Sequence, residues 1–370
     1  MEKYDVVIAG GGPGGCSAAL NLHRLDPDLA RRTLVLEKAR HPREKVCGGG
    51  LTLKVDLLLS LMGLQLTVPY TQLNVQRIRY HGRNYDYLLH GWVKVIRRDE
   101  FDASLARALA ERGIALHEEE EVTDVKWERD GIAVSTSRGS YLAKVVVAAD
   151  GVHSVVRRKM GFPAGKPLIQ DLVVELPCDV KREPVWLYKM MLNDWDCYDL
   201  GSYGYYWEFP VLVRGKQHLQ CGLYSVSREE SKNVKPVDVF REMLKRRGIK
   251  LDDHKLLGFP ERGFDPEAEF SQPNVLLIGE AAGIDVLTGE GISQAMEYGV
   301  LAAETVVDAF RSGDLSFKGY KEALLKSRLG RELARNLKVA EIAFDANYDA
   351  TVPLRLAAFK KADSLERLRI

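Results

Sequence analysis

The sequence predicts an α/β fold with a Rossmann-like nucleotide-binding domain, an antiparallel β-sheet domain and a C-terminal helical segment. A buried strand at 4–9 leads into a glycine-rich turn and a helical pattern, as at the start of a dinucleotide-binding unit. A nearly all-apolar strand at 143–149 and a strand–loop–helix unit at 274–310 indicate further parallel strands. Residues 186–224 hold ten aromatic side chains, which strands favour.

The bulk composition is that of a globular protein large enough for two domains, with 370 residues and a net charge of +1. A near-neutral chain argues against nucleic acid as the main partner. The five cysteines are odd in number and lack C-x-x-C spacing, so we expect no disulfide framework, no metal site and a reducing, cytoplasmic location. The start of the chain lacks a signal-peptide core, and the apolar stretch at 55–68 is too short to span a bilayer.

The glycine-rich turn fits G-x-G-x-x-G at Gly10, Gly12 and Gly15. The first glycine allows the tight turn, the second lets the backbone approach a pyrophosphate, and the third lets helix and strand pack closely. A second strand at 33–38 contains Glu37 near its end, where a carboxylate suits the ribose hydroxyls of adenosine. This acidic residue disfavours a 2′-phosphate, so FAD or NAD fits better than NADP.

Two later segments favour a single flavin site, because no second G-x-G-x-x-G follows a strand. The strand at 143–149 ends in Asp150, followed by a glycine, a serine and two arginines. The loop after the strand near 275 contains Gly279 and Glu280. Two glycines then precede a helix whose N-terminal amides suit a negatively charged ring or a pyrophosphate.

These three fingerprints, in this order, resemble the p-hydroxybenzoate hydroxylase type of flavoprotein over residues 1 to about 312. The resemblance implies a FAD-binding domain of the p-hydroxybenzoate hydroxylase and glutathione reductase type. The family usually has Asp where this chain has Glu280, so we expect the ribityl contact to survive with a longer side chain. The family also has an arginine near the pyrophosphate, just before a helix like the one at 97–113, which favours Arg98, with Arg97 as the alternative.

The cofactor-binding residues that we predict lie in one of these motifs or beside the expected position of the flavin ring. They are Gly10, Gly12, Pro13, Gly14, Gly15, Glu37, Lys38, Cys47, Gly48, Gly49, Arg98, Val122, Asp150, Gly279, Glu280, Gly289, Gly291 and Ile292.

Two features single out one branch of this superfamily. The segment KVCGGGLT around Cys47 and the segment YGYYWEFP at 203–210 both resemble the geranylgeranyl reductase family. Strand alternation places Tyr205, Trp207 and Phe209 on one face, where they would form the wall of an apolar pocket ending at Pro210. The alternative is an ordinary aromatic core sheet, since aromatic residues favour strands in any case.

In this interpretation, the glycines after Cys47 make room for the flavin ring. A backbone without Cβ atoms can lie against the flat flavin ring, and the thiol of Cys47 tolerates an apolar pocket. We therefore expect hydride transfer from reduced FAD to a C=C bond of a prenyl-type substrate, with Cys47 shaping the site as the catalytic candidate. The alternative is that Cys47 only packs.

Other readings of the same fingerprints stay open. The Y-x-W-x-F-P pattern at 205–210 partly echoes flavin halogenases, so a monooxygenase or halogenase acting on an aromatic or apolar substrate is the alternative function. A flavin-binding protein without catalysis is a further class. With no second Rossmann domain, the electron donor is either NAD(P)H at an improvised site or an external reduced protein.

The FAD domain is predicted to consist of several separate segments of the chain, whose bounds are set by the positions of the motifs. We place the FAD domain at 1–67, 95–163 and 267–312, the substrate domain at 68–94 and 164–266, and C-terminal helices at 313–370. That last segment has 12 basic and 8 acidic residues and an amphipathic pattern. Such a pattern suits peripheral membrane contact with a lipid-like substrate, although a solvated helix face is the commoner explanation.

Overall fold

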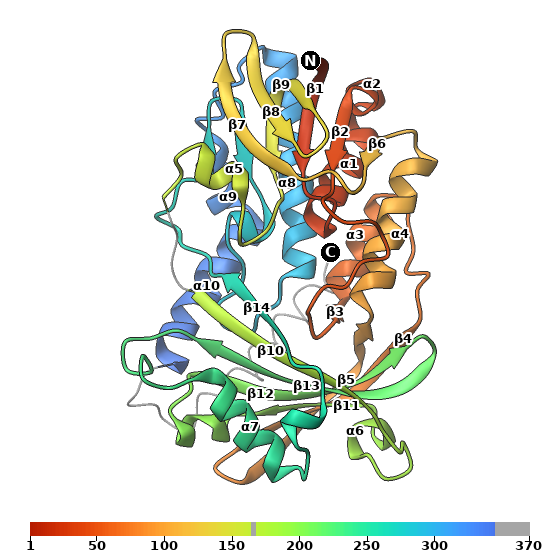
Figure 1. Ribbon diagram of the computed structural model, residues 1–370, viewed down its shortest axis with the longest axis vertical. Coiled ribbons are helices and arrows are strands. Elements are labelled where there is room, and N and C mark those ends of the chain that lie inside the picture. Colours follow the sequence, from red (N-terminus) through yellow and green to blue (C-terminus); the bar gives the residue numbers. More distant parts are fainter. Residues whose placement is uncertain (164–167, 345–370) are drawn as a thin grey trace.

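The computed structural model describes residues 1–163 and 168–344, and it arranges them around two eight-stranded sheets, one above the other (Figure 1). The order along the first sheet is β15-β16-β9-β1-β2-β6, with β8 paired to β9 and β7 paired to β8. Its strands are β1 (Glu2–Ala9), β2 (Thr33–Leu36), β6 (Ala115–His117), β7 (Val122–Glu128), β8 (Gly131–Thr136), β9 (Ser140–Ala148), β15 (Ser271–Gln272) and β16 (Val275–Leu277).

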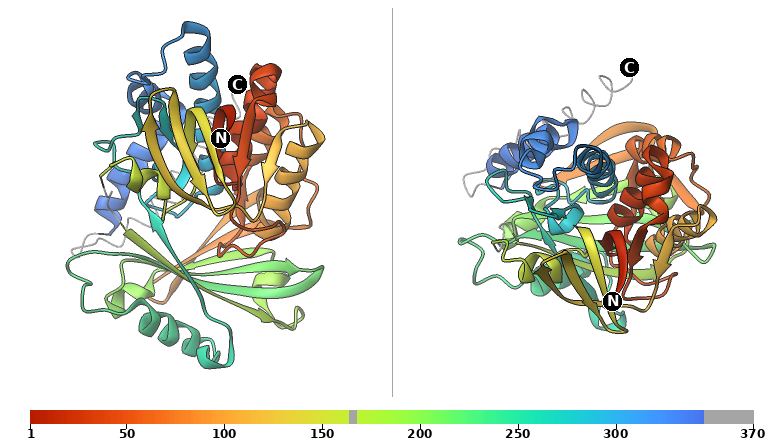
Figure 2. Two further views of the ribbon diagram at one scale, coloured as in Figure 1. Left: turned by 45° about the horizontal axis from the view of Figure 1, so that its top comes forward. Right: turned by 90° about the horizontal axis from the view of Figure 1, so that it is seen from above.

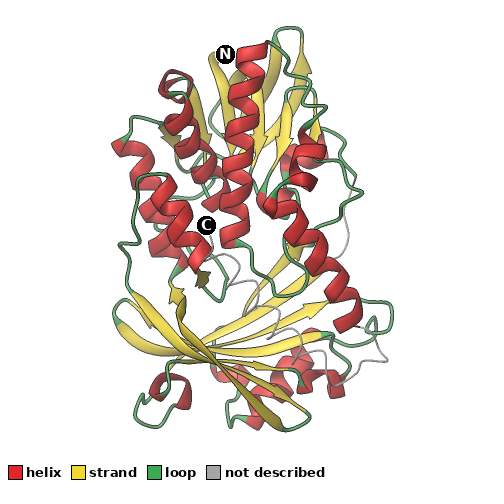
Figure 3. Ribbon diagram, turned by 180° about the vertical axis from the view of Figure 1, so that it is seen from behind, coloured by secondary structure: helices red, strands yellow, loops and turns green. Residues whose placement is uncertain are grey.

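The central strands of the first sheet are parallel, as continuous apolar strands covered by helices predict. Helices cover one face of this sheet, and the β7–β8 hairpin lies on the other side (Figures 1 and 3). The helices of this layer are α1 (Pro13–Leu25), α2 (Pro27–Arg31), α3 (Leu53–Leu61), α4 (Arg98–Glu111) and α8 (Ile292–Ser312), whereas α5 (Val155–Lys159) packs against β7. The strand–turn–helix start and the long helix after 291 are where the sequence predicts them.

The second sheet runs in the order β14-β10-β13-β12-β11-β4-β5-β3 and is antiparallel except where β11 pairs with β4. Its strands are β3 (Gly50–Thr52), β4 (Tyr70–Tyr80), β5 (Arg83–Ile96), β10 (Leu168–Pro177), β11 (Met190–Asp194), β12 (Gly204–Val213), β13 (Lys216–Val226) and β14 (Leu257–Arg262). Helix α7 (Pro236–Arg246) packs on the outer face, away from the first layer, and α6 (Pro184–Leu187) precedes β11 (Figure 2). The sheet is built from the segments predicted to form the substrate domain, with β3 added from the first segment of the predicted FAD domain.

The amphipathic stretch at 320–344 forms two helices rather than one. Helix α9 (Tyr320–Lys326) ends at Ser327, whose extended backbone starts α10 (Arg328–Ala343) and whose hydroxyl accepts from the Gly330 amide at 3.0 Å. Helix α10 runs from the first layer to the second sheet, where Phe344 stacks on Trp195 (Figure 1). No helix within the described ranges is long and apolar enough to cross a membrane. The rest of the predicted C-terminal segment, 345–370, lies outside the described residues.

Candidate active site

The glycine turn after β1 leaves no room for side chains at its two ends. Gly10 has a φ of +105°, and a Cβ there would lie 2.3 Å from the carbonyl oxygen of Ala149. A Cβ at Gly15 would lie 1.9 Å from the carbonyl oxygen of Gly10. Gly12 lacks such a clash, since its nearest neighbour is the guanidinium of Arg43 at 3.5 Å from the Cβ position. The turn therefore forms a cradle with its open side toward Arg43, as a phosphate-binding turn needs.

Glu37 closes one end of this cradle. Its buried carboxylate accepts from the amide of Gly11 at 3.0 Å and from the amide of Ala39 at 3.0 Å. The carbonyl of Glu37 accepts from the amide of Glu120, two residues before β7 begins at Val122. The predicted ribose residue and Val122 thus lie on neighbouring backbone segments, while Lys38 is exposed beside them.

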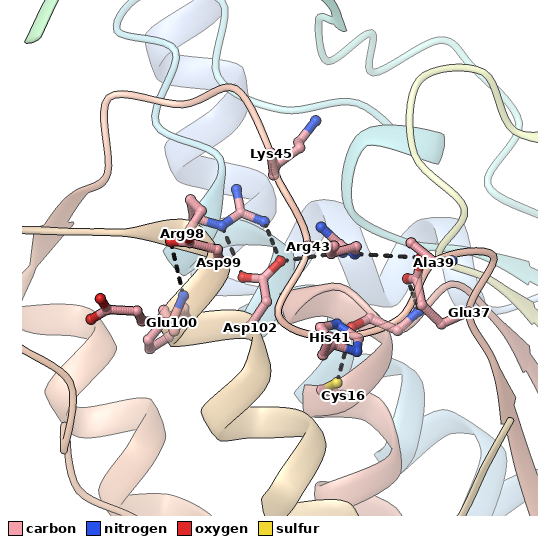
Figure 4. A network of polar contacts seen from close by, with 12 residues as sticks. Cys16, Glu37, Ala39, His41, Arg43, Lys45, Arg98, Asp99, Glu100 and Asp102 are labelled. Atoms are coloured by element: carbon pink, nitrogen blue, oxygen red, sulfur yellow. Dashed lines mark hydrogen bonds and ion pairs between the residues drawn. The ribbon is translucent and has the colours of Figure 1, made fainter. Parts of the chain in front are cut away.

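Arg43 is a site residue that the sequence interpretation missed. Figure 4 shows its guanidinium between two carboxylates, 3.4 Å from Glu37 and 3.2 Å from Asp102. Asp102 also accepts two hydrogen bonds of 2.9 Å from Arg98, so Arg98 is held by its own helix α4. The charge facing the glycine turn is therefore that of Arg43, while Arg98 interacts with Asp102 and with the side chain of Cys47. Arg97 points elsewhere, since it forms ion pairs with Glu175 and Asp99.

Helices α1 and α8 run side by side with their N-termini at the same edge of the sheet. A Cβ at Gly14 would lie 3.3 Å from the carbonyl oxygen of Ala295, and a Cβ at Gly299 would lie 2.7 Å from the amide of Ala18. This close packing of α1 against α8 brings the turn at Gly10–Pro13 and the N-terminus of α8 at Ile292 to the same edge of the sheet. The predicted residues Gly279, Gly289 and Gly291 belong to the segment that leads into α8, and the first two have positive φ.

Asp150 and Glu280 lie on two loops that meet at this edge. One oxygen of Asp150 accepts from the amides of Val155 and Val156 at 2.7 and 3.1 Å, while its other oxygen is buried with no hydrogen-bond partner among the described residues. Burial raises the pKa of Asp150, against these hydrogen bonds, which lower it. A Cβ at Gly151 would lie 3.6 Å from Glu280, whose carboxylate is 3.6 Å from Lys45.

The residues fit a dinucleotide flavin. The open side of the glycine turn at Gly12, the buried carboxylate of Glu37 and the unpartnered buried oxygen of Asp150 are features that such a ligand would complete.

The segment 45–50 crosses the inner face of the second sheet, between the two layers. The ammonium of Lys45 is 3.0 Å from the centre of the Phe259 ring, and the carbonyl of Cys47 accepts from Gln220 at 3.2 Å. A Cβ at Gly48 would lie 2.9 Å from the ring of Phe209. Gly48 is therefore needed for this contact, and the thiol of Cys47, which accepts from the Gly49 amide at 3.3 Å, is half-buried beside the sheet.

The inner face of the second sheet is aromatic, as the alternation predicts. Tyr205, Trp207 and Phe209 lie on it, and Pro210 is on the outer face by the same alternation. A Cβ at Gly222, opposite Trp207, would lie 2.2 Å from the indole ring. Tyr205 stacks on Tyr224 with ring centres 5.2 Å apart, and the two hydroxyl groups donate to the carbonyls of Thr288 and Val286 at 2.6 Å each. The tyrosines thus join this face to the loop before α8.

Comparison with known proteins identifies the family. A family model described as an FAD binding domain matches residues 3–297. The chain belongs to this FAD-binding family. A relative from Methanosarcina barkeri, described as uncharacterised, is 30% identical over 92% of this chain and 82% of that protein. The digeranylgeranylglycerophospholipid reductase of Methanocella arvoryzae is 26% identical over 92% of this chain and 87% of that protein.

Among solved structures, a geranylgeranyl bacteriochlorophyll reductase-like protein from Thermoplasma acidophilum shares the fold. It superposes with a TM-score of 0.78 at 23% identity, covering 100% of this chain and 99% of that one. These findings confirm the predicted fold class, the FAD-dependent oxidoreductase class and the resemblance to the geranylgeranyl reductase family. FAD is the cofactor of this family; the individual contacts named above stay predictions.

Proposed function

We propose that this FAD-dependent oxidoreductase adds hydrogen across a C=C bond of an apolar, prenyl-type substrate. The observation that carries the proposal is the seating of the Cys47–Gly50 backbone on the aromatic inner face of the second sheet, next to the loops that suit the flavin. The relative from Methanocella arvoryzae, named for reduction of a digeranylgeranyl lipid, supports the same reaction.

Several parts of the chain would hold FAD. The glycine turn and Arg43 suit the pyrophosphate, Glu37 suits the adenosine ribose, and Glu280 suits the ribityl chain. Bound in its reduced form, FAD would supply the hydride. The chain itself excludes water with the Gly48–Phe209 contact and holds the substrate against aromatic rings.

The inner face sets the substrate class. Trp207 and Phe209 are tilted rings with centres 4.7 Å apart, and the row continues through Tyr205 to Trp195, 5.8 Å away. A row of rings with few charges suits a long apolar chain, since apolar pockets bind ligands through buried area and a few polar contacts. Cys47 borders this row, where its thiol would position the alkene.

An anaerobic assay tests the proposal and separates it from a monooxygenase or halogenase. The holoenzyme is reduced with dithionite, so that the natural electron donor, NAD(P)H or a protein carrier, is not needed. A digeranylgeranylglycerophospholipid is then added without oxygen. We expect reoxidation of the flavin spectrum and a lipid product heavier by two hydrogens for each double bond reduced. A flavin that stays reduced until oxygen is admitted would contradict the proposal.

Peripheral membrane contact belongs to the same proposal. The +4 excess of the C-terminal segment and a lipid substrate support peripheral membrane contact. Co-sedimentation with anionic liposomes checks this contact, and protein that stays in the supernatant would contradict it.

A further inference from the structure

Two carboxyl groups lie on the inner face of the second sheet, among the aromatic rings. The register places Asp171 of β10 between Tyr224 of β13 and Phe259 of β14, with Tyr205 next along the same row. Glu261 of β14 lies one step along from Phe259 on the same face. Carboxyl groups are expensive to bury in such a surface unless they are paired or protonated.

The two groups are close to each other and to the loops of the flavin site. They are diagonal neighbours on adjacent strands, because Asp171 pairs with Phe259 and Glu261 pairs with Ile169. A Cβ at Gly289, in the loop before α8, would lie 3.6 Å from Oε2 of Glu261 and 2.7 Å from the ring of Tyr224. The pair therefore forms part of the wall where the second sheet meets the loop 285–291.

The charged groups around the pair are few, and most are acidic. Lys45 approaches from the 45–50 segment, but it is turned toward Glu280 at 3.6 Å and lies over the Phe259 ring. Figure 4 shows Lys45 pointing away from the Arg43–Asp102 network. The other titratable groups that act on the pair or on its tyrosine neighbours are Glu280, Cys47, Tyr205, Tyr224, Asp285 and Glu290.

One oxygen of the pair has no partner. Oε2 of Glu261 is buried and makes no hydrogen bond within the described part of the chain. Burial raises the pKa of Glu261 well above its usual range, and the neighbouring Asp171 and Glu280 raise it further. Burial also raises the pKa of Asp171, to about 7. Two carboxyl groups at neighbouring positions of one buried face cannot both ionise readily, so one proton stays on the pair at neutral pH.

We propose that Asp171 and Glu261 share one proton and are the acid that protonates the substrate alkene. In this step the carboxyl O–H bond and the C=C π bond break, and a new C–H bond forms on one alkene carbon. The second carbon receives the hydride that reduced flavin supplies, and the carboxylate left behind takes a proton from water. The acid role rests on the proposed function, whereas the shared proton does not.

The shared proton is measured on the protein without turnover. Infrared difference spectra between neutral and alkaline pH, recorded with and without FAD, show the C=O stretch of a protonated carboxylic acid. We expect such a band at neutral pH in the natural chain, with a changed frequency and titration in Asp171→Asn and in Glu261→Gln, and its loss when both changes are combined. Glu208→Gln is the matched control, because Glu208 is a buried carboxylate of the same sheet on the opposite face, ion-paired with Arg247. A band that is unchanged in both single variants, or that survives in the double variant, would overturn the shared proton.

The acid role is measured by single turnover of the dithionite-reduced holoenzyme with the digeranylgeranyl lipid. We expect each pair variant to slow flavin reoxidation by about 10²- to 10⁴-fold, the usual contribution of a general acid, with FAD affinity unchanged. In the natural chain the rate should fall as pH rises and the pair loses its proton, and this dependence should move to a different pH in Glu261→Gln, where Asp171 alone carries the proton. An unchanged rate or an unchanged pH profile would overturn the acid role. If the natural chain itself fails to reduce the lipid, the proposed function and the acid role fail, and the infrared result still decides the shared proton.

Discussion

At the scale of single residues, the site depends on positions where a side chain cannot be added. The sequence predicted the glycine turn and Glu37, because their spacing is set by the backbone geometry of one turn. It did not predict Arg43, because that residue lies in an irregular segment and reaches the turn only through the tertiary fold. Arg98 was predicted because the family that the sequence resembles has an arginine near the flavin pyrophosphate. In the structure, the guanidinium of Arg98 donates two hydrogen bonds to Asp102.

Arg43→Ala should weaken FAD binding. The change removes the charge that faces the glycine turn and leaves Glu37 and Asp102 with less compensation. Loss of one member of a buried charge cluster typically costs about 2–5 kcal/mol, so we expect a drop in affinity of at least roughly thirtyfold. Flavin fluorescence titration of the apoprotein gives the dissociation constant, and exposed Arg40→Ala is the control. Equal affinities for the two variants would contradict the role given to Arg43.

Cys47→Ala should change turnover and product pattern while leaving FAD bound. The thiol borders the row of aromatic rings, so its removal loosens the fit of the alkene. We expect a loss of turnover on the order of tenfold, typical of a misplaced substrate rather than a lost nucleophile. Lipid product analysis by mass spectrometry checks this, with half-buried Cys178→Ala as the control. Unchanged turnover and products would show that Cys47 only packs.

At the scale of secondary-structure elements, the aromatic face depends on pairs of strands fitting together. Alternation along β12 predicted which rings share a face, because the period of a strand is two residues. It also places Pro210, one of the predicted substrate contacts, on the outer face, and Pro210 was assigned from the motif rather than from the alternation. The partners on β13 could not be predicted, since Gly222 and Gln220 carry no motif and only the register sets them opposite Trp207 and Phe209.

Gly222→Ala should destabilise the protein by displacing the Trp207 ring. A Cβ there would lie 2.2 Å from the indole, and overpacking of this kind typically costs about 1–3 kcal/mol. Urea unfolding gives the free energy of unfolding, with Gly139→Ala as a control because nothing lies within 4 Å of its Cβ position. Combining Gly222→Ala with Trp207→Phe should cost less than the sum of the two single changes. Additive costs would contradict the contact.

At the scale of the whole molecule, the structure depends on ion pairs that join segments far apart in the sequence. The ammonium of Lys54, buried at the start of α3, is 3.2 Å from Glu297 of α8 and 2.6 Å from Glu332 of α10. The sequence predicted the helices, but it carried no signal for a lysine that joins segments more than 240 residues apart. The predicted domain boundaries likewise stay predictions, and β3 shows how closely the two parts interlock.

Lys54→Met should release α10 and destabilise the fold. Removing one partner of a buried ion pair leaves uncompensated charge and typically costs about 3–5 kcal/mol. Burial lowers the pKa of Lys54, but Glu290, Glu297 and Glu332 raise it more, and the net pKa is above its usual value. The stabilisation is therefore complete below the unfolded pKa near 10.5 and is lost as pH rises through the folded pKa.

Unfolding measured from neutral to strongly alkaline pH checks this tie. The gap in stability between the natural chain and Lys54→Met should be constant at neutral pH and close only in strong alkali. The control is Lys126→Met, because Lys126 is an exposed lysine ion-paired with Asp124. A gap that already closes near neutral pH, or no gap at all, would contradict the tie.

The central claim is that the Cys47–Gly50 backbone and the aromatic inner face enclose both the flavin ring and an apolar alkene. A crystal structure of the holoenzyme with a bound digeranylgeranyl lipid tests it most directly. We expect the flavin ring to lie against the glycine backbone, with a prenyl double bond between that ring and Trp207, within reach of Asp171 and Glu261. A lipid bound elsewhere, or rings of Tyr205, Trp207 and Phe209 fully packed with no ligand against them, would contradict it.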